Sequence, residues 1–250
     1  MLSVVLATFN EALNLERCLN SIKSIADEIV VVDGDSTDGT KEIAKSFGDK
    51  VINTTNKANF HINKQMAIDA AKGDLILQLD ADEVVDEELA EFIKKVRVDG
   101  DVVAWNIKRK NYFLGKPLKK GGQYPDPVIR LFVAHKAHLP QENVHEQMLV
   151  DGDVAMAEGH LLHFPYPDLN SYFRKFNTYT SFEAGRQFSS GVRATWFKLQ
   201  EYYVWKPLKI VFSLFIRHRG YVDGVRGFLF AVLSAMHHPV IFLKIWELEQ

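Results

Sequence analysis

The sequence predicts an α/β protein with an open, mostly parallel sheet flanked by helices, followed by a helical, aromatic-rich C-terminal extension. Short apolar segments alternate with segments of helical periodicity as far as residue 98, which is typical of βαβ units. Beyond residue 163 the apolar residues recur at three- and four-residue spacing, as they do in helices. The chain has 250 residues, 47% of them hydrophobic, which suffices for one sizeable core and an appendage.

Each predicted strand of the N-terminal part is a short apolar run, and these runs are residues 2–7, 28–32, 51–53 and 75–79. Strands buried on both faces of a parallel sheet have such continuous apolar sequences. The predicted helices lie between them and cover residues 14–22, 37–47, 59–72 and 86–98. In sheets of this kind ligands bind at the carboxyl ends of the strands, so the turns after the strands are where a site is expected.

Two further strands are predicted later in the chain. Alternating polarity over residues 102–114 and an apolar run over 128–133 indicate them, and the glycines and prolines of residues 121–127 predict an irregular loop between them. We expect one domain over residues 1–165 and a helical region over residues 166–250.

The two parts differ in charge and in aromatic content. Residues 1–159 carry 19 Lys and Arg against 26 Asp and Glu, whereas residues 160–250 carry 11 against 6 and hold 20 of the 29 aromatic residues. In the C-terminal part, basic and aromatic residues are interleaved. This pattern favours either an anionic membrane surface or an aromatic core or oligomer interface, and no nucleic-acid-binding signature accompanies it.

Cysteine usage and hydropathy predict a cytoplasmic location. The single cysteine, Cys18, excludes a disulfide within the chain and favours a reducing compartment. The apolar N-terminus is short and lacks a basic segment, so it predicts a first strand and not a signal peptide. Residues 227–246 are interrupted by His237, His238 and Pro239, so we do not expect a membrane span there, although contact with the inner face of the membrane remains compatible with the sequence.

Polar and acidic residues follow three of the predicted strands. Because the carboxyl ends of parallel strands meet at one edge of a sheet, these side chains should lie near one another. The candidates are Thr8 and Glu11 after the first strand, Asp33 and Asp35 after the second, and Asp80 and Asp82 after the fourth.

The pair Asp80 and Asp82 has two interpretations. Acidic residues before a helix can simply complement the helix dipole. Two carboxylates one residue apart at a strand end can also hold Mg²⁺ or Mn²⁺, and such an ion binds a diphosphate well. The sequence contains neither a GxGxxG fingerprint nor a P-loop, so neither of those motifs explains a nucleotide site.

Several segments resemble a known family. SVVLATFNEALNLERCLNSI, EIVVVDGDSTDGT and GDLILQLDADE, in this order, resemble the nucleotide-sugar-binding half of family 2 glycosyltransferases with the Rossmann-like GT-A fold. YPDPVIRLF, NVHEQM, HFPYPDLNSYFRKFNTY and DGVRGFLFAVLSAMHHPVIFLKIWE resemble a narrower branch, the lipopolysaccharide core β-glucosyltransferases. The resemblance implies an inverting, metal-dependent transfer of a hexose, with glucose expected, from a UDP-sugar to a saccharide such as a lipopolysaccharide core.

The resemblance also implies roles for the candidate residues. Thr8 and Glu11 match the turn that lines the uridine pocket. The second turn differs from the family pattern, because Asp33-Gly34-Asp35-Ser36 replaces the usual Asp-Asp-Gly-Ser or Asp-Ser-Gly-Ser, so both Asp33 and Asp35 remain candidates for the base. Asp80 and Asp82 match the DxD motif, with Asp82 the expected direct metal ligand.

The remaining roles fall in the middle of the chain. The family spacing makes Glu146 the first candidate for the catalytic base, and Asp126 is the second. Among the late histidines His145, His160 and His163, the resemblance favours His163 as a metal ligand. Arg130 is the strongest candidate for neutralising phosphate, whereas the basic cluster at residues 108–110 is typical of a solvated face.

Two other functions compete with this hypothesis. A sugar-1-phosphate nucleotidyltransferase would share the sheet and the acidic metal site, but its first turn is usually rich in glycine and basic residues, and ATFNEALN has neither. A non-catalytic, membrane-associated scaffold with the same fold is the other, and the presence of Asp80, Asp82 and Glu146 argues against it.

Overall fold

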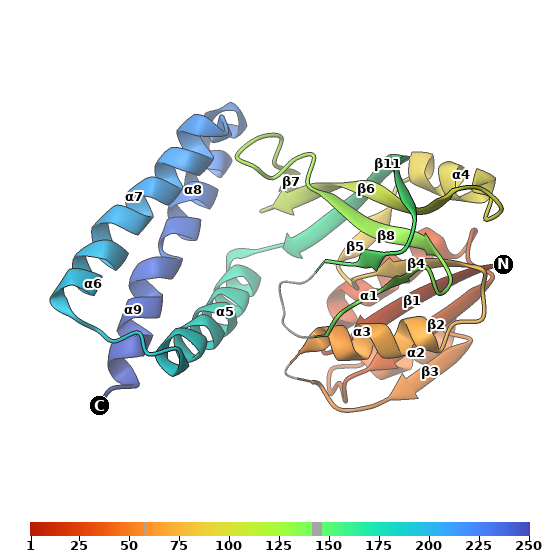
Figure 1. Cartoon of the computed structure of the whole chain (residues 1–250), viewed down its shortest axis with the longest axis horizontal. Coiled ribbons are helices and arrows are strands. Elements are labelled where there is room, and N and C mark those ends of the chain that lie inside the picture. The colour runs from red at the N-terminus through yellow and green to blue at the C-terminus, as the bar shows by residue number, and fades with distance from the viewer. Residues whose placement is uncertain (58, 142–146) are drawn as a thin grey trace. The chain divides into compact units, whose positions relative to one another are not determined.

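The computed structural model describes residues 1–57, 59–141 and 147–250, and it divides into two compact units (Figure 1). The first unit comprises residues 1–109 and 127–163. The second comprises residues 110–126 and 164–250. The structure thus groups the segment 110–126 with the C-terminal helices, a grouping for which the local sequence gave no signal.

The first unit is built on a mixed sheet. Its strands β1 (Leu2–Thr8), β2 (Glu28–Asp33), β3 (Lys50–Asn53) and β4 (Leu75–Leu79) are parallel and lie in the order β3-β2-β1-β4. The sheet continues through β8 (Pro127–Val133), β6 (Val102–Phe113), β11 (Asp153–Tyr166) and β5 (Glu83–Val85), where the neighbouring pairs β4–β8, β6–β8 and β11–β5 are antiparallel. The predicted α/β class and the predicted strands are confirmed, and parallel pairing is confined to the first four strands.

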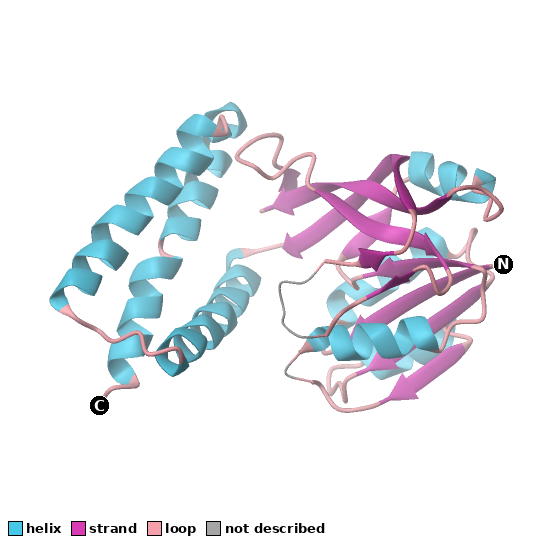
Figure 2. Cartoon of the chain, in the orientation of Figure 1, coloured by secondary structure: helices cyan, strands magenta, loops and turns pink. Residues whose placement is uncertain are grey.

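Helices cover both faces of the parallel strands (Figure 2). Side chains alternate between the two faces of a strand, so Val4 and Leu6 of β1 join one core and Val5 joins the other. The first core includes residues of α1 (Ala12–Ile22), α2 (Thr40–Phe47) and α4 (Glu87–Lys95), and the second includes residues of α3 (Phe60–Asp69).

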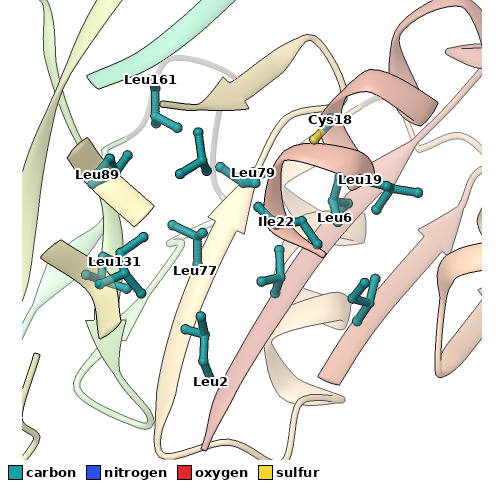
Figure 3. Packing of buried hydrophobic residues seen from close by; sticks show 14 of the residues in the cluster. Leu2, Leu6, Cys18, Leu19, Ile22, Leu77, Leu79, Leu89, Leu131 and Leu161 are labelled. Atoms are coloured by element: carbon teal, nitrogen blue, oxygen red, sulfur yellow. The ribbon is translucent and has the colours of Figure 1, made fainter. Parts of the chain in front are cut away.

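The first core is closely packed around the inner side of α1 (Figure 3). Leu15, Leu19 and Ile22 recur at helical spacing and are fully buried, and burying such a side chain contributes about 1.5–3 kcal/mol. Cys18 lies on the same side of the helix and is also fully buried, as expected of a small core residue.

Strands β5 and β11 were not predicted from the sequence. The inward positions of β11 are occupied by Ala157, Gly159 and Leu161. This inner face is only weakly apolar, so the sequence does not show the alternation of apolar and polar residues that usually marks a strand. Gly159 has φ +80°, and a Cβ atom there would lie 2.2 Å from the backbone nitrogen of Leu89. Glycine is therefore required where β11 passes the start of α4.

The second unit contains a short hairpin and a group of helices. Strand β7 (Lys116–Pro117) pairs with the end of β6, and the helical part begins with α5 (Leu169–Ser189). A continuous helical segment follows, formed by α6 (Trp196–Gln200), the π-helix η1 (Glu201–Trp205), α7 (Lys206–Val211) and the π-helix η2 (Phe212–Arg217). The second unit ends with the 3₁₀ turn η3 (Gly220–Asp223), α8 (Gly224–Ala235) and α9 (His237–Glu247).

One helical segment of the described chain is long and apolar enough to cross a membrane. It covers residues Gly220–Glu247, with a mean hydropathy of 1.7 over its most apolar window. His237, His238 and Pro239 were expected to interrupt this apolar segment, but they lie within it. Length and composition alone do not separate a membrane span from a helix that packs within the protein.

Candidate active site

The turns that follow β1 and β2 are joined around a buried carboxylate. Asp33 ends β2 with no exposed surface, and its carboxylate accepts hydrogen bonds from Thr8 Oγ1 (3.1 Å), Ser36 N (2.8 Å) and Ser36 Oγ (2.6 Å). The parallel register places Thr8 directly opposite Asp33. Burial of this carboxylate is thus offset by three hydrogen bonds from neutral donors.

The same two turns are linked by their backbones. Asn10 N donates to Ser36 Oγ, and Glu11 N donates to Thr40 Oγ1 at 2.8 Å. The carboxylate of Glu11 accepts from the side chain of Asn14 at 2.8 Å. Neither Ser36 nor Asn10 was singled out as a site residue in the sequence, because Asn and Ser are ordinary turn residues there.

Asp35 has different surroundings from Asp33. It adopts a positive φ of 71°, its side chain is 73% exposed, and it pairs with Lys41 Nζ at 2.6 Å. The hydrogen bond from Lys41 lowers the pKa of this carboxyl. The structure therefore places one of the two acidic candidates of this turn inside the fold and the other in solvent.

At the end of β4 the carboxylate of Asp80 lies between two cations. Lys64 of α3 pairs with Asp80 Oδ1 at 2.5 Å, and Arg130 of β8 pairs with Asp80 Oδ2. Burial alone would raise the pKa of Asp80, but Arg130 and Lys64 together outweigh it and hold the pKa well below its usual value. Asp80 is thus ionised and engaged with its own chain.

Glu83 ties this network to the sheet. Its side chain is fully buried, and its carboxylate accepts from Asp80 N at 2.9 Å and from Arg130 at 3.1 Å. Arg109 of β6 lies 3.5 Å from the same carboxylate. Arg109 belongs to the basic cluster expected in solvent, but its side chain is only 19% exposed because β6 runs next to β8 in the sheet.

Asp82 faces a histidine that comes from a distant strand. The antiparallel register of β5 and β11 sets His163 opposite Glu83, and His163 Nε2 lies 3.6 Å from Asp82 Oδ1. Burial is the main reason that the pKa of His163 is lowered, although Asp82 and Glu83 act in the opposite direction. A lowered pKa favours the neutral imidazole, which is the form that ligates metals.

Asp82 and His163 fit a divalent cation. A carboxylate oxygen and an imidazole nitrogen at this separation can both bind one ion. The pair suits Mn²⁺, and it also suits Mg²⁺ when water and phosphate oxygens supply the remaining ligands. Asp80 is paired with Lys64 and Arg130, whereas Asp82 Oδ1 lies 3.6 Å from His163 Nε2, so Asp82 is the carboxylate of the DxD motif that shares a candidate metal site with the histidine.

A second group of potential ligands lies at the start of α4. Asp86, Glu88 and His160 offer ligand atoms within 4.8 Å of one another. Asp86 Oδ1 already accepts from Leu89 N and His160 N, both at 2.9 Å, so this carboxylate serves as the helix cap. We assign no metal to this group.

A basic depression of about 310 Å³ adjoins Asp80. Its lining includes the cationic side chains of Lys64, Arg109 and Arg130 together with the apolar residues Val128 and Ile129. A larger hollow of about 560 Å³ opens near Gly73 and Asp74, where β4 begins, and therefore lies at the opposite end of that strand. The chemistry of the lining, and not the volume, identifies the first depression as part of the site.

A comparison with protein-family models matches residues 3–156 to "Glycosyl transferase family 2". The chain belongs to glycosyl transferase family 2. The family predicted from the sequence is thereby confirmed, and the observed architecture is the GT-A fold of this family, a mixed sheet with flanking helices and a helical C-terminal region.

Curated relatives align over almost the whole glycosyltransferase chain. A lipopolysaccharide core biosynthesis glycosyltransferase, LpsC of Rhizobium meliloti, is 29% identical over 98% of this chain and 92% of its own length. An uncharacterized glycosyltransferase of Rickettsia typhi is 28% identical over 99% of this chain and 87% of its own.

Solved structures resemble the chain more distantly. TarS of S. aureus matches 98% of this chain at 15% identity with a TM-score of 0.45, and this match covers 50% of TarS. Glucosyl-3-phosphoglycerate synthase of Mycobacterium tuberculosis, solved with Mn²⁺, UDP and glucosyl-3-phosphoglycerate, matches 45% of this chain at 21% identity with a TM-score of 0.36. The chain spans half or less of these two solved chains.

The structure of this glycosyltransferase brings most of the predicted residues together in two groups. Thr8, Glu11 and Asp33 meet at the β1 and β2 turns, and Asp80, Asp82, Arg130 and His163 meet at the end of β4. Asp126 lies in the second unit, where its carboxylate accepts from Asn111 at 2.8 Å. Glu146 lies outside the described residues, as does His145.

Proposed function

We propose that this glycosyltransferase moves a hexose, with glucose as the first candidate, from a UDP-sugar to a saccharide acceptor such as a lipopolysaccharide core, with inversion at the anomeric carbon. The observation that carries the donor half of the proposal is the pair Asp82 and His163 beside the basic depression at the end of β4. The acceptor half is supported by the relation to LpsC, whose name refers to lipopolysaccharide core biosynthesis.

In this proposal the nucleotide binds over the turns after β1 and β2. Asp33 orders the first part of this surface, because its hydrogen bonds to Thr8 and Ser36 fix both turns. Glu11 and Asp35 lie at the outer side of the same turns and are candidates for the ribose and the base. Hydrogen bonds to these carboxylates would favour a nucleoside whose base offers an N–H donor.

Asp82 and His163 would hold Mn²⁺ or Mg²⁺, and the ion would stabilise the negative charge of the departing diphosphate. Arg130, which Asp80 and Glu83 keep in place, presents a fixed positive charge next to this position. Because Arg130 is largely buried, its charge is screened less than that of a surface arginine would be.

A carboxylate must take the proton of the acceptor hydroxyl as its oxygen attacks the anomeric carbon. We assign this role to Glu146 and keep Asp126 as the alternative. Glu146→Gln should retain donor binding and lose transfer, measured as sugar release and acceptor glycosylation. Turnover near that of the unmodified enzyme in Glu146→Gln, together with loss in Asp126→Asn, would move the role to Asp126.

The proposal is tested by titrating UDP into the protein calorimetrically, with and without Mn²⁺. We expect UDP to bind more tightly with Mn²⁺, and Asp82→Asn to remove that gain while leaving metal-free binding unchanged. Asp74→Asn is the matched control, because Asp74 is an exposed carboxylate beside the opposite end of β4. Equal UDP affinity with and without the ion would contradict the metal site, and a panel of UDP-sugars in the same assay identifies the donor.

A further inference from the structure

Large apolar side chains are exposed along one helical hairpin of the second unit. Figure 1 shows the helices of this hairpin, α6 and α7 in one arm and α8 in the other. The first arm of this hairpin is the helical segment 196–217, and the second arm begins with η3 and α8, which packs against α7. Phe197 is 82% exposed and Trp205 is 67% exposed. We call the hairpin face the following exposed apolar residues of the two arms: Phe197, Trp205, Leu208, Phe212, Ile216, Tyr221, Val222, Val225 and Phe228. Trp196, Tyr203, Val204 and Leu229 are also exposed on these arms.

The hairpin face forms a stripe along the first arm. Trp205, Leu208, Phe212 and Ile216 follow one another at three- and four-residue spacing, which places them on one side of a helix. The arm already has an inner side for its own packing, because Tyr202 is buried together with residues of α9. Soluble monomers rarely expose contiguous apolar patches larger than a few hundred Å², so a stripe of this length indicates a binding surface.

Positive charge surrounds this stripe. Residues 193–226 contain seven Lys and Arg and two acidic residues. Both acidic side chains are engaged within the unit: Glu201 pairs with Lys198 (2.7 Å) and Lys206 (2.9 Å), and Asp223 accepts from the backbone of Lys119 and Lys120. The exposed cations beside the hairpin face are Lys119, Lys120, Lys209, Arg217 and Arg219.

The other side of the unit is unsuited to a lipid interior. Helix α9 packs against α5, and Lys244 Nζ binds the side chains of Asn177, Thr180 and Ser181 of α5 at 2.7–2.8 Å. If Gly220–Glu247 crossed a bilayer, this lysine and its polar partners would have to enter it as well, at a considerable cost. The arrangement favours a hairpin that lies on a membrane and not one that spans it.

A second copy of the chain is a poorer occupant of the same surface. In a twofold dimer through the hairpin face, each basic surface would meet its own copy. Like charges placed opposite one another oppose association, whereas anionic headgroups complement them. Aromatic side chains such as Trp205 and Tyr221 also suit the boundary between headgroups and acyl chains.

We propose that the hairpin face docks this protein on an anionic phospholipid bilayer, with its aromatic and aliphatic side chains at the headgroup level and its Arg and Lys side chains on lipid phosphates. The docking does not depend on the proposed sugar transfer. A test that measures vesicle binding without turnover therefore separates failure of the one from failure of the other.

The experiment mixes the full chain with vesicles of phosphatidylcholine alone or with added phosphatidylglycerol, and follows co-sedimentation and tryptophan emission. We expect binding and a blue shift only with phosphatidylglycerol. Trp205→Phe should reduce the shift more than Trp246→Phe, because Trp205 lies on the hairpin face whereas Trp246 is exposed on α9. Trp105 is buried in the sheet, and Trp196 is exposed at the start of the first arm. Equal binding to both kinds of vesicle, or to neither, would overturn the proposal.

Matched variants separate the apolar and the charged parts of the surface. Phe212→Glu should abolish binding, whereas Leu13→Glu, at an 85% exposed position of α1, should not. Arg217→Gln with Arg219→Gln should weaken partitioning by about fivefold for each positive charge removed, and Lys45→Gln should leave it unchanged. Far-UV circular dichroism checks folding. A dimer that Phe212→Glu dissociates in analytical ultracentrifugation would assign the surface to self-association instead.

Discussion

The two acidic turns at the edge of the sheet hold their carboxylates in different ways. Asp33 at the end of β2 is surrounded by neutral donors, from Thr8 and Ser36. Asp80 at the end of β4 is paired with two cations, Lys64 and Arg130. Neutral donors hold a carboxylate in place without adding positive charge. Cations that pair with a carboxylate can also pair with an anionic ligand when it arrives.

This difference suggests separate tasks for the two turns in a glycosyltransferase. In the proposed function, the hydrogen-bonded β2 turn would contact the base and ribose. The β4 turn carries charges of both signs, with Asp82 and His163 beside them, and would hold the diphosphate and a metal. Substitutions in the two turns should therefore differ both in size and in what they affect.

The largest effect is expected at Arg130. Arg130→Met leaves Asp80 and the fully buried Glu83 without their main cation, and breaking a buried ion pair in this way costs about 3–5 kcal/mol. Urea unfolding at neutral pH should show this loss. Arg97→Met, at an exposed position after α4, should leave the unfolding midpoint unchanged. A loss below about 1 kcal/mol would mean that the network is solvent-screened and the contrast between the turns is smaller than described.

An intermediate effect is expected at Ser36. Ser36→Ala removes the hydroxyl donor to Asp33 and the acceptor for Asn10 N, and a hydrogen bond to a charged group contributes about 1.5–3 kcal/mol. The free energy of unfolding should fall by about 2 kcal/mol, and UDP affinity should fall with it. Ser46→Ala, at an exposed position of α2, is the control. Lost stability with unchanged UDP affinity would separate this turn from nucleotide binding.

The sequence predicted much of this edge but not all of it. Strand and helix alternation placed Asp33, Asp80 and Asp82 together, because parallel strands share an edge and the apolar runs marked each strand. Glu83 and Lys64 were not anticipated as site residues. Nothing in the local sequence indicates that Glu83 and Lys64 are buried in the fold.

His163 illustrates what local patterns cannot supply. The resemblance to family 2 favoured it, but its position beside Asp82 follows from the register between β5 and β11, two strands separated by more than sixty residues. Antiparallel pairing over such a separation depends on the whole fold, and the small inward residues of β11 concealed even the strand itself.

The smallest change in stability, and the sharpest test of the β2 turn, is expected at Asp35. This carboxylate is exposed and pairs with Lys41 at the surface, so Asp35→Asn should not move the urea unfolding midpoint. If Asp35 rather than Asp33 contacts the base or ribose, the same variant should still weaken UDP binding measurably in calorimetry. Glu42→Gln is the control, because it alters an exposed carboxylate of α2. Asp38→Asn is less suitable, because the Asp38 carboxylate accepts a hydrogen bond from Thr40. Unchanged UDP affinity in Asp35→Asn would mean that the base and ribose are recognised by the surface that Asp33 orders. The contrast between the β2 turn, held by neutral donors, and the β4 turn, held by cations, would then apply to ligand binding as well.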